Sequence, residues 1–426
     1  MIHVDDQAFG QGYFEGRFAE FAAHPLLSRW SGRRLAVCLK DTALWIALCL
    51  YIKENGGTVF PLPVDTPLEA ACRRAGRSGC EALITANDDG LLEAVEIEPA
   101  AAFSDSPPGL IQTSSGTTGE PKFIERSWAS IDTEIESYVR HFPEANAWTP
   151  IVACPVTHSY GLICGVLVAL RRGVQPVIIR NLNPKFILRK LREAPASILY
   201  SSPAMIATLA MFVKDQEPLW AVMTSGTVLQ KATFESLGKK VRHLYQQYGC
   251  SEAGCLSLGT GLLSANDQGQ PLPHNTVAAG VNAREPADII VTLPDGRTVE
   301  TRDLGYFEGG RLHFVSRLDE MINVAGFNVY PVEVEEVILT LPGVRDAVIF
   351  KKTRGFGGDQ VCLQFVSDEE ISAETVRDFC TGKLAAHQVP MNIVRVETIP
   401  RLPNGKISRK ALAMESAAIT PAAALP

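Results

Sequence analysis

Residues 113–122 read Thr113-Ser114-Ser115-Gly116-Thr117-Thr118-Gly119-Glu120-Pro121-Lys122, directly after an apolar, strand-like segment. The two glycines allow the backbone to approach an anion closely, and the five hydroxyl side chains and the lysine supply hydrogen-bond donors. This composition predicts a loop that binds a polyphosphate. An ordinary flexible surface loop is the alternative that composition alone leaves open.

The loop does not have the spacing of a Walker motif, which requires Gly-x-x-x-x-Gly-Lys-Ser/Thr. Gly116 is followed five positions later by Pro121 rather than by a second glycine. A phosphate-loop ATPase or kinase is therefore disfavoured.

Length and composition describe a globular chain with at least two domains. The chain has 426 residues, of which 46% are hydrophobic and 20% are charged. A formal net charge of −7 argues against a nucleic-acid partner, because neutralising phosphates needs a basic surface. The longest apolar run, residues 43–52, is too short to span a membrane as a helix, and no secretory signal is evident. None of the ten cysteines lies in a Cys-x-x-Cys pair, so we expect reduced thiols and a cytoplasmic location.

Up to about residue 266 the sequence alternates strand-like and helix-like segments. Extended segments at 34–39 and 59–61 flank a helix-length apolar stretch at 42–54, and the same alternation resumes after Pro107-Pro108. This alternation predicts an α/β fold, with mainly parallel sheets covered by helices.

The pattern changes beyond residue 266. Segments 288–293 and 297–301 flank Pro294-Asp295-Gly296, a hairpin signal that predicts a β-rich subdomain. A compact α+β pattern follows Arg317. We therefore expect a large domain over residues 1–318 and a small C-terminal domain over residues 319–426.

Four further motifs follow the loop in chain order. They are Tyr248-Gly249-Cys250-Ser251-Glu252, Thr301-Arg302-Asp303, Arg317-Leu318-Asp319 with Ile322-Asn323-Val324-Ala325-Gly326, and Leu402-Pro403-Asn404-Gly405-Lys406. Together with residues 113–122 they resemble, in order, the motifs of the acyl-adenylate-forming superfamily. This superfamily includes acyl- and aryl-CoA ligases, luciferase and the adenylation domains of non-ribosomal peptide synthetases. The chain is identified as a short, stand-alone member on five matches that span Thr113 to Lys406.

The resemblance implies that the large domain binds ATP and Mg²⁺. The motif aspartate, Asp303, would take both ribose hydroxyls, and Glu252 would help hold the metal ion together with Thr118. Ser225-Gly226-Thr227 resembles the turn that borders the adenine and acyl pockets, although it departs from the family pattern after Gly226. The expected nucleotide contacts are Thr113, Ser114, Ser115, Gly116, Thr117, Thr118, Gly119, Lys122, Ser225, Gly226, Tyr248, Gly249, Ser251, Asp303 and Arg317.

The expected chemistry explains why these residue types are needed. A carboxylate that attacks the α-phosphate of ATP is an anion meeting an anion, so the site must neutralise charge before the bond forms. The resemblance assigns this role to Lys406, which would bridge the carboxylate and the α-phosphate; without its motif Lys406 is an ordinary solvated lysine. The candidate catalytic residues are Lys406, Glu252 and His158.

The same resemblance predicts that the small domain is mobile. Asp319 occupies the hinge position, with a plain surface carboxylate as the alternative. After adenylation the small domain would rotate and carry Lys406 out of the site. Asn323 and Gly326 would then line the path of the incoming thiol.

The acyl pocket is expected to include His158-Ser159-Tyr160, where His158 acts as a gate or is simply a structural histidine. Relatives that use α-amino acids place an aspartate at the position of Ser159, but residues 149–182 contain no carboxylate. A buried ammonium group without a partner is costly, so an α-amino acid is disfavoured and an aryl or short unsaturated acid is favoured. The expected pocket residues are His158, Ser159, Tyr160, Gly226, Thr227 and Tyr248.

The acceptor thiol remains open between two candidates. No carrier-protein module follows Lys406, so we expect coenzyme A or the phosphopantetheine of a separate carrier protein. A stand-alone amino-acid-adenylating enzyme is the alternative activity. A non-catalytic adenylate-binding scaffold is less favoured, because Glu252, Asp303, Arg317 and Lys406 are all retained.

Overall fold

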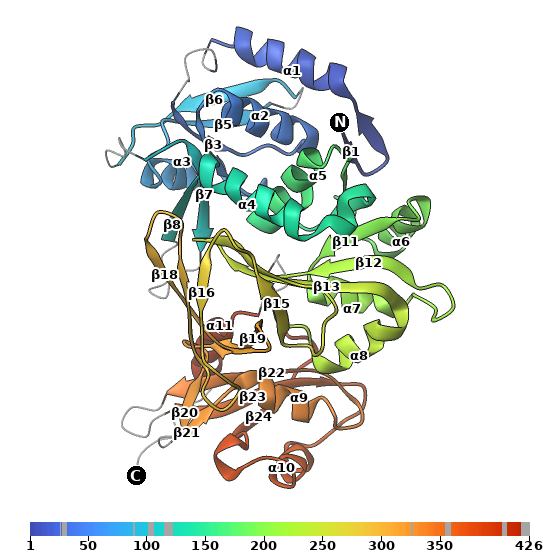
Figure 1. The fold of residues 1–426 in the computed structure, drawn as a ribbon. Helices are drawn as coiled ribbons and strands as arrows, with labels where there is room; N and C mark the ends of the chain where they lie inside the picture. Colours follow the sequence, from blue (N-terminus) through green and yellow to red (C-terminus); the bar gives the residue numbers. More distant parts are fainter. Residues whose placement is uncertain are drawn as a thin grey trace.

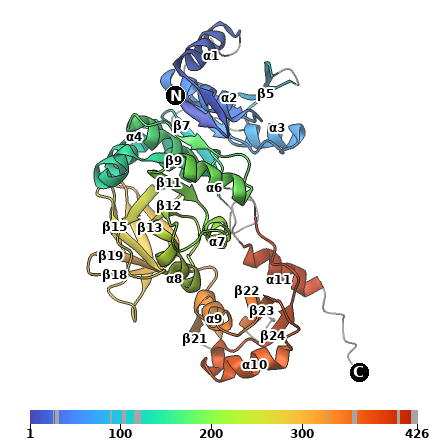
Figure 2. The ribbon, with the colours of Figure 1, turned by 90° about the vertical axis from the view of Figure 1, so that its right-hand side faces the viewer.

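The structure is a computed structural model that describes residues 1–25, 27, 32–87, 90–100, 106–114, 122–324, 327–353, 359–402 and 407–418. Two large sheets stack with a layer of helices between them, and a small domain lies at the end of the molecule opposite the first sheet (Figure 1, Figure 2). No helix in the described part of the chain combines the length and hydropathy that a membrane crossing needs.

The first sheet has six strands in the order β6-β5-β3-β4-β7-β8. Its four central strands are parallel, and the two edge strands, β6 and β8, are antiparallel to their neighbours. The helix after β3 is well capped, since the Asp41 carboxylate accepts hydrogen bonds from the Ala43 and Leu44 amides. The elements are β3 (Arg34–Val37), α2 (Thr42–Glu54), β4 (Thr58–Pro61), α3 (Leu68–Arg77), β5 (Ala82–Ala86), β6 (Leu92–Glu96), β7 (Gly109–Ser114) and β8 (Lys122–Ser127), preceded by α1 (Gln11–Ala23).

The second sheet has thirteen strands, and its order is β16-β17-β18-β19-β15-β14-β13-β12-β11-β9-β10-β1-β2. The run from β13 to β1 is parallel, and the other neighbouring pairs are antiparallel. Its strands are β1 (Ile2–Val4), β2 (Gln7–Phe9), β9 (Thr149–Ala153), β10 (Val177–Ile178), β11 (Ser197–Ser201), β12 (Leu219–Thr224), β13 (Val241–Cys250), β14 (Gly254–Gly259), β15 (Asp267–Pro271), β16 (Thr276–Ala278), β17 (Ala287–Thr292), β18 (Thr298–Glu308) and β19 (Arg311–Arg317).

Helices cover both faces of the parallel part of this sheet. One core joins the two sheets, because apolar side chains of β3 and β11 are buried in the same cluster as those of α2 and α4. A second core lies on the other face, beneath α6, α7 and α8. The helices are α4 (Trp128–His141), η2 (Pro143–Ala147), η3 (Tyr160–Leu167), α5 (Val168–Arg171), α6 (Pro184–Glu193), α7 (Pro203–Ala210) and α8 (Lys231–Lys240).

The small C-terminal domain has its own hydrophobic core. A three-stranded sheet in the order β22-β23-β24 carries helices, and a short hairpin precedes it. The elements are β20 (Ile322–Val324), β21 (Phe327–Val329), α9 (Pro331–Ile338), β22 (Val344–Thr353), β23 (Asp359–Ser367), α10 (Ala373–Thr381), η5 (Ala386–Gln388), β24 (Asn392–Arg395) and α11 (Arg409–Ala418).

The predicted fold class is confirmed, and the structure adds three details that the sequence did not indicate. The β-rich subdomain is not a separate sheet, because β14 and β15 join its strands to the parallel strands. The first residues pair with β10 and so belong to the second sheet. The helical segment over residues 160–171 begins as a π-helix, η3, before it continues as α5. Gly161 of η3 lies so close to the Pro155 carbonyl that a Cβ atom would be 2.4 Å from its oxygen.

Candidate active site

The predicted site residues gather where strands of the two sheets end. Thr113 lies near the end of β7, Ser225 directly follows β12, and Tyr248 lies near the end of β13 (Figure 1). Ligands of α/β proteins bind at the carboxyl ends of parallel strands. The ends of β7 and β12 are joined through the start of η3, because Ser159 binds Gln112 of β7 and Tyr160 binds the Met223 carbonyl of β12.

Asp303 is the best-defined member of the site. Its side chain accepts a hydrogen bond from the Tyr248 hydroxyl at 2.8 Å, and the Arg317 guanidinium lies 3.2 Å from its other oxygen. Both Asp303 and Tyr248 are buried. Burial, and after it the nearby Asp303 carboxylate, raises the pKa of Tyr248 well above its usual value. The phenol therefore keeps its proton and donates a hydrogen bond to the carboxylate.

The backbone around Asp303 is fixed by the preceding threonine. The Thr301 hydroxyl donates to the Ile289 carbonyl at 2.8 Å and accepts the Asp303 amide at 3.1 Å. Arg302 has a φ of 62°, a left-handed value that favours glycine. Its side chain is exposed, while Thr301 and Asp303 on either side of it are buried.

Arg317 links Asp303 to the predicted hinge. Its Nε atom donates to the Asp319 carboxylate at 3.0 Å, while its other end faces Asp303. Burial disfavours the charged guanidinium, but the Asp303 and Asp319 carboxylates outweigh it and raise the pKa of Arg317. The three residues therefore form one charged chain at the boundary with the small domain.

Glu252 lies at the tip of the hairpin between β13 and β14, where its side chain is partly exposed. The hairpin is tight: a Cβ atom on Gly249 would lie 2.2 Å from the Gly254 carbonyl oxygen. The register of the two strands shifts between Tyr248 and Gly249. A β-bulge at this point re-aims the strand, and bulges often occur beside active sites.

A polar pair lies on the predicted acyl side of the site. The Ser159 hydroxyl donates to the Gln112 side-chain carbonyl at 3.0 Å, and Gln112 is buried in β7. The sequence analysis did not single out Gln112, although it is a polar residue that directly follows the apolar pair Leu110-Ile111. The Tyr160 hydroxyl donates to the Met223 carbonyl at 2.7 Å, and burial raises the pKa of Tyr160 well above its usual value. Tyr160 is thus held as a neutral phenol.

Among the other predicted residues, Ser225 and Asn323 form side-chain hydrogen bonds, whereas several others are exposed. Ser225 donates to the Gln247 carbonyl at 3.0 Å, and the following Gly226 has a φ of 94°, which favours glycine. His158 is exposed at the start of η3. Asn323 donates to Asn328 at 3.1 Å across β20 and β21. The exposed positions also include Thr227 and Lys122, while Ser251 is partly exposed.

Several predicted residues lie outside the described part of the chain. For the loop, the structure describes only its flanks, where Ser114 pairs with Lys122 across β7 and β8. The predicted residues outside the described ranges are Ser115, Gly116, Thr117, Thr118, Gly119, Gly326 and Lys406.

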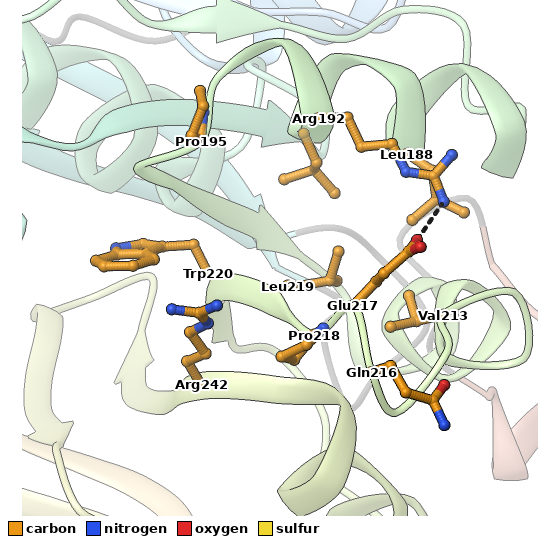
Figure 3. Close-up of a pocket in the computed structure, with 11 residues that line it drawn as sticks. Leu188, Arg192, Pro195, Val213, Gln216, Glu217, Pro218, Leu219, Trp220 and Arg242 are labelled. Carbon is orange, nitrogen blue, oxygen red and sulfur yellow. Dashed lines mark ion pairs between the residues drawn. The ribbon is translucent and has the colours of Figure 1, made fainter.

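A cavity of about 420 Å³ lies away from these residues (Figure 3). It opens between α6, the residues after α7 and the start of β12, so it faces the amino-terminal end of that strand rather than the end that leads to Ser225. Arg192 and Glu217 approach to 4.0 Å at its side, and Arg242 lies over the Trp220 ring. None of the predicted site residues lines this cavity.

Gly249→Ala tests whether the hairpin that carries Glu252 is as tight as the geometry indicates. The added methyl group collides with the Gly254 carbonyl, so we expect the free energy of unfolding to fall by about 1–3 kcal/mol, as for other overpacked sites. Urea unfolding measures it. Gly238→Ala is the control, because Gly238 lies in α8 with open space around it and should gain about 1 kcal/mol. Equal stability of the parent and Gly249→Ala would refute the tight hairpin.

Solved structures share the fold. The chain superposes on ATP-bound MatB from Rhodopseudomonas palustris with a TM-score of 0.82 and 19% sequence identity, covering 97% of this chain and 95% of that one. It superposes equally well on o-succinylbenzoate CoA synthetase (MenE) from Bacillus subtilis in complex with its acyl-adenylate intermediate, with a TM-score of 0.82, 19% identity, and coverage of 96% and 94%.

Sequence comparisons establish the family. The family model of AMP-binding enzymes matches residues 96–286, and that of the AMP-binding enzyme C-terminal domain matches residues 333–406. The chain is 38% identical over 416 residues to a 3,4-dihydroxybenzoate–[aryl-carrier protein] ligase of Bacillus anthracis, covering 97% of this chain and 99% of the relative. It is 24% identical over 330 residues to a 2-succinylbenzoate–CoA ligase of Lactococcus lactis, covering 74% and 72%. The chain therefore belongs to the family of AMP-binding enzymes and is an AMP-forming acid–thiol ligase.

Proposed function

We propose that this enzyme activates a hydroxylated benzoic acid as an aryl-AMP and transfers the aryl group to the phosphopantetheine thiol of a separate carrier protein. The observation that carries the proposal is the neutral Ser159–Gln112 pair on the acyl side. The relative from B. anthracis, similar along its whole length, supports the same class of acid and acceptor.

The polar pair favours a neutral, hydroxylated ring over an amino acid. An ammonium group in a buried pocket needs an anionic partner, and a serine and an amide supply none. A phenolic hydroxyl can instead donate to or accept from a serine hydroxyl and an amide group. A dihydroxylated benzoate therefore matches the side chains that Ser159 and Gln112 present.

The site fits a magnesium ion bound mainly by the substrate. Mg²⁺ usually takes one or two carboxylates from the protein and completes its shell with phosphates and waters. Glu252 offers one partly exposed carboxylate on a fixed turn, and no cluster of three histidine, cysteine or acidic side chains occurs among the described residues. Thr118 would be the second protein ligand. When bound, the ion would neutralise part of the triphosphate charge.

The first half-reaction forms a bond between a carboxylate oxygen of the acid and the α-phosphorus of ATP, and the bond to pyrophosphate breaks. Asp303 would accept hydrogen bonds from the ribose hydroxyls and so fix the nucleotide. Lys406 would place its ammonium group between the two anions, where its stabilisation is largest in the transition state.

In the second half-reaction the carrier thiolate attacks the acyl carbon, and AMP leaves. Rotation about Asp319 would remove Lys406 and bring Asn323 to the path of the thiol. In the present arrangement Asp319 is bound by Arg317, so this ion pair is one contact that rotation would break. The pair is partly exposed and therefore contributes little stability, which suits a hinge.

Asp303→Asn tests the nucleotide assignment. Hydrogen bonds to a charged group contribute about 1.5–3 kcal/mol, so the dissociation constant for ATP should rise about 10- to 100-fold. Isothermal calorimetry measures it, and Asp295→Asn, at an exposed hairpin carboxylate, is the matched control. An unchanged constant in a folded Asp303→Asn protein would reject the role of Asp303.

Carboxylate-dependent ATP–pyrophosphate exchange identifies the acid. We expect dihydroxylated benzoates to support exchange and alkyl and α-amino acids to fail. Lys406→Ala should lower the rate roughly 10²- to 10³-fold, whereas thiol transfer from supplied aryl-AMP should be largely retained. The control is Lys383→Ala, at an exposed lysine of the same domain. Equal loss of both half-reactions would contradict the role of Lys406.

Competition between a carrier protein and coenzyme A identifies the acceptor of the aryl group. When the enzyme itself forms the aryl-AMP, we expect kcat/KM for a phosphopantetheinylated aryl carrier protein to exceed that for coenzyme A about tenfold or more. Such a ratio corresponds to a difference of about 1.4 kcal/mol. Mass spectrometry of the carrier and chromatography of acyl-CoA measure the two products. Preferred use of coenzyme A would instead place the enzyme with ligases such as that of L. lactis.

A further inference from the structure

A buried ion pair lies behind the hairpin that carries Glu252. Arg126 on β8 and Glu134 on α4 approach to 2.7 Å, and their side chains are only 4% and 2% exposed. Neither residue belongs to any of the five sequence motifs that resemble those of the family. Few charged side chains are so completely buried, and those that are need a partner.

The carboxylate of Glu134 has a second partner in the hairpin itself. Its Oε1 atom accepts the backbone amide of Cys255 at 2.8 Å. Cys255 lies in β14, directly after the turn at residues 251–253, and pairs with Gly249 across the hairpin. The ion pair therefore contacts the strand three residues beyond Glu252.

The shape of the hairpin matches the ion pair closely. Gly254 has a φ of 79°, and a Cβ atom at this position would lie 2.2 Å from Glu134 Oε2 and 2.4 Å from Arg126 Nη1. Because Gly254 has no side chain, the two charged groups can occupy this space. The backbone at Gly254, two residues after Glu252, therefore packs directly against them.

The chain also connects this pair to the strands that flank the predicted polyphosphate-binding loop of residues 113–122. Arg126 lies in β8, which begins where residues 113–122 end, and it pairs with Leu110 of β7 in the sheet. Its guanidinium is therefore fixed relative to the strands on both sides of the loop. Through Glu134, the hairpin with Glu252 is fixed relative to the same strands.

Stability alone does not account for such a pair. Apolar residues of similar volume often replace a buried ion pair without loss of stability. An apolar pair, however, cannot accept the Cys255 amide and so cannot fix the hairpin in one position. Residues that orient a metal-binding group, without touching the metal, typically affect metal affinity or activity about 10- to 100-fold.

We propose that Arg126 and Glu134 are positioning residues that hold the Glu252 turn at a set place relative to β7 and β8, and so determine the magnesium dependence of adenylation. This inference rests on the proposed function, in which Glu252 helps hold the magnesium ion of MgATP. Neither residue contacts the substrate.

Two double variants separate positioning from stability. Arg126→Met/Glu134→Leu removes both charges and the acceptor for the Cys255 amide, whereas Arg126→Met/Glu134→Gln removes the charges and keeps an acceptor. We expect the first to need about 10- to 100-fold more Mg²⁺ for half-maximal ATP–pyrophosphate exchange, with KM for the acid unchanged. The second should return the Mg²⁺ requirement to within about threefold of the parent. Thermal unfolding of each variant is measured alongside.

Arg34→Met/Glu125→Leu is the matched control. It removes another largely buried ion pair of β8, which joins this strand to β3 rather than to the hairpin. We expect its Mg²⁺ requirement to equal that of the parent. Magnesium-dependent ATP affinity, measured by calorimetry without any acid, is recorded for all variants. This readout tests the inference even if no acid tested supports exchange, an outcome that would count against the proposed function alone.

Either of two results would overturn the inference. One is a parental Mg²⁺ requirement in Arg126→Met/Glu134→Leu. The other is an equal loss in both double variants that follows their loss of thermal stability, which would make the ion pair a structural element only.

Discussion

The buried carboxylate of Asp303 is surrounded by groups from three strands, and the arrangement of the site follows from the need to hold that charge. Tyr248 donates to it from β13, Thr301 fixes its backbone in β18, and Arg317 faces it from β19. A buried carboxylate without such partners would be costly. Because Arg317 also binds Asp319, the group predicted to hold the ribose and the predicted hinge are joined through one guanidinium.

The residue after the predicted hinge, Glu320, is bound to the small domain. Glu320 pairs with Arg409 at 2.8 Å, and Arg409 also binds Glu335 of α9 at 2.8 Å. Burial opposes the charge on Arg409, but Glu335 and Glu320 outweigh it and raise its pKa. Asp319 is thus tied to the large domain and Glu320 to the small one. Arg409 follows Lys406 by three positions, so the same ion pairs adjoin the segment that carries the predicted catalytic lysine.

The sequence predicted the family and the α/β class because both depend on local patterns: motifs in order, and strands alternating with helices. It could not pair residues distant in sequence. Gln112 and Ser159 are 47 positions apart in the sequence but form a hydrogen bond in the fold. The sequence around either residue gives no indication of this contact. Arg126 and Glu134 look like ordinary surface charges, since their burial depends on the tertiary packing of α4 against β14. The strand β1 was missed because its pairing partner, β10, lies far along the chain.

In the proposed mechanism the acid is activated by direct bonding to the α-phosphorus of ATP. The most direct test supplies a dihydroxybenzoate whose carboxylate is labelled with ¹⁸O, together with ATP and a phosphopantetheinylated carrier protein. Mass spectrometry then follows the label. We expect AMP to carry one ¹⁸O atom for each thioester formed, because the acid's oxygen stays on phosphorus when the thiol displaces AMP. Unlabelled AMP, or ADP and phosphate as products, would contradict it.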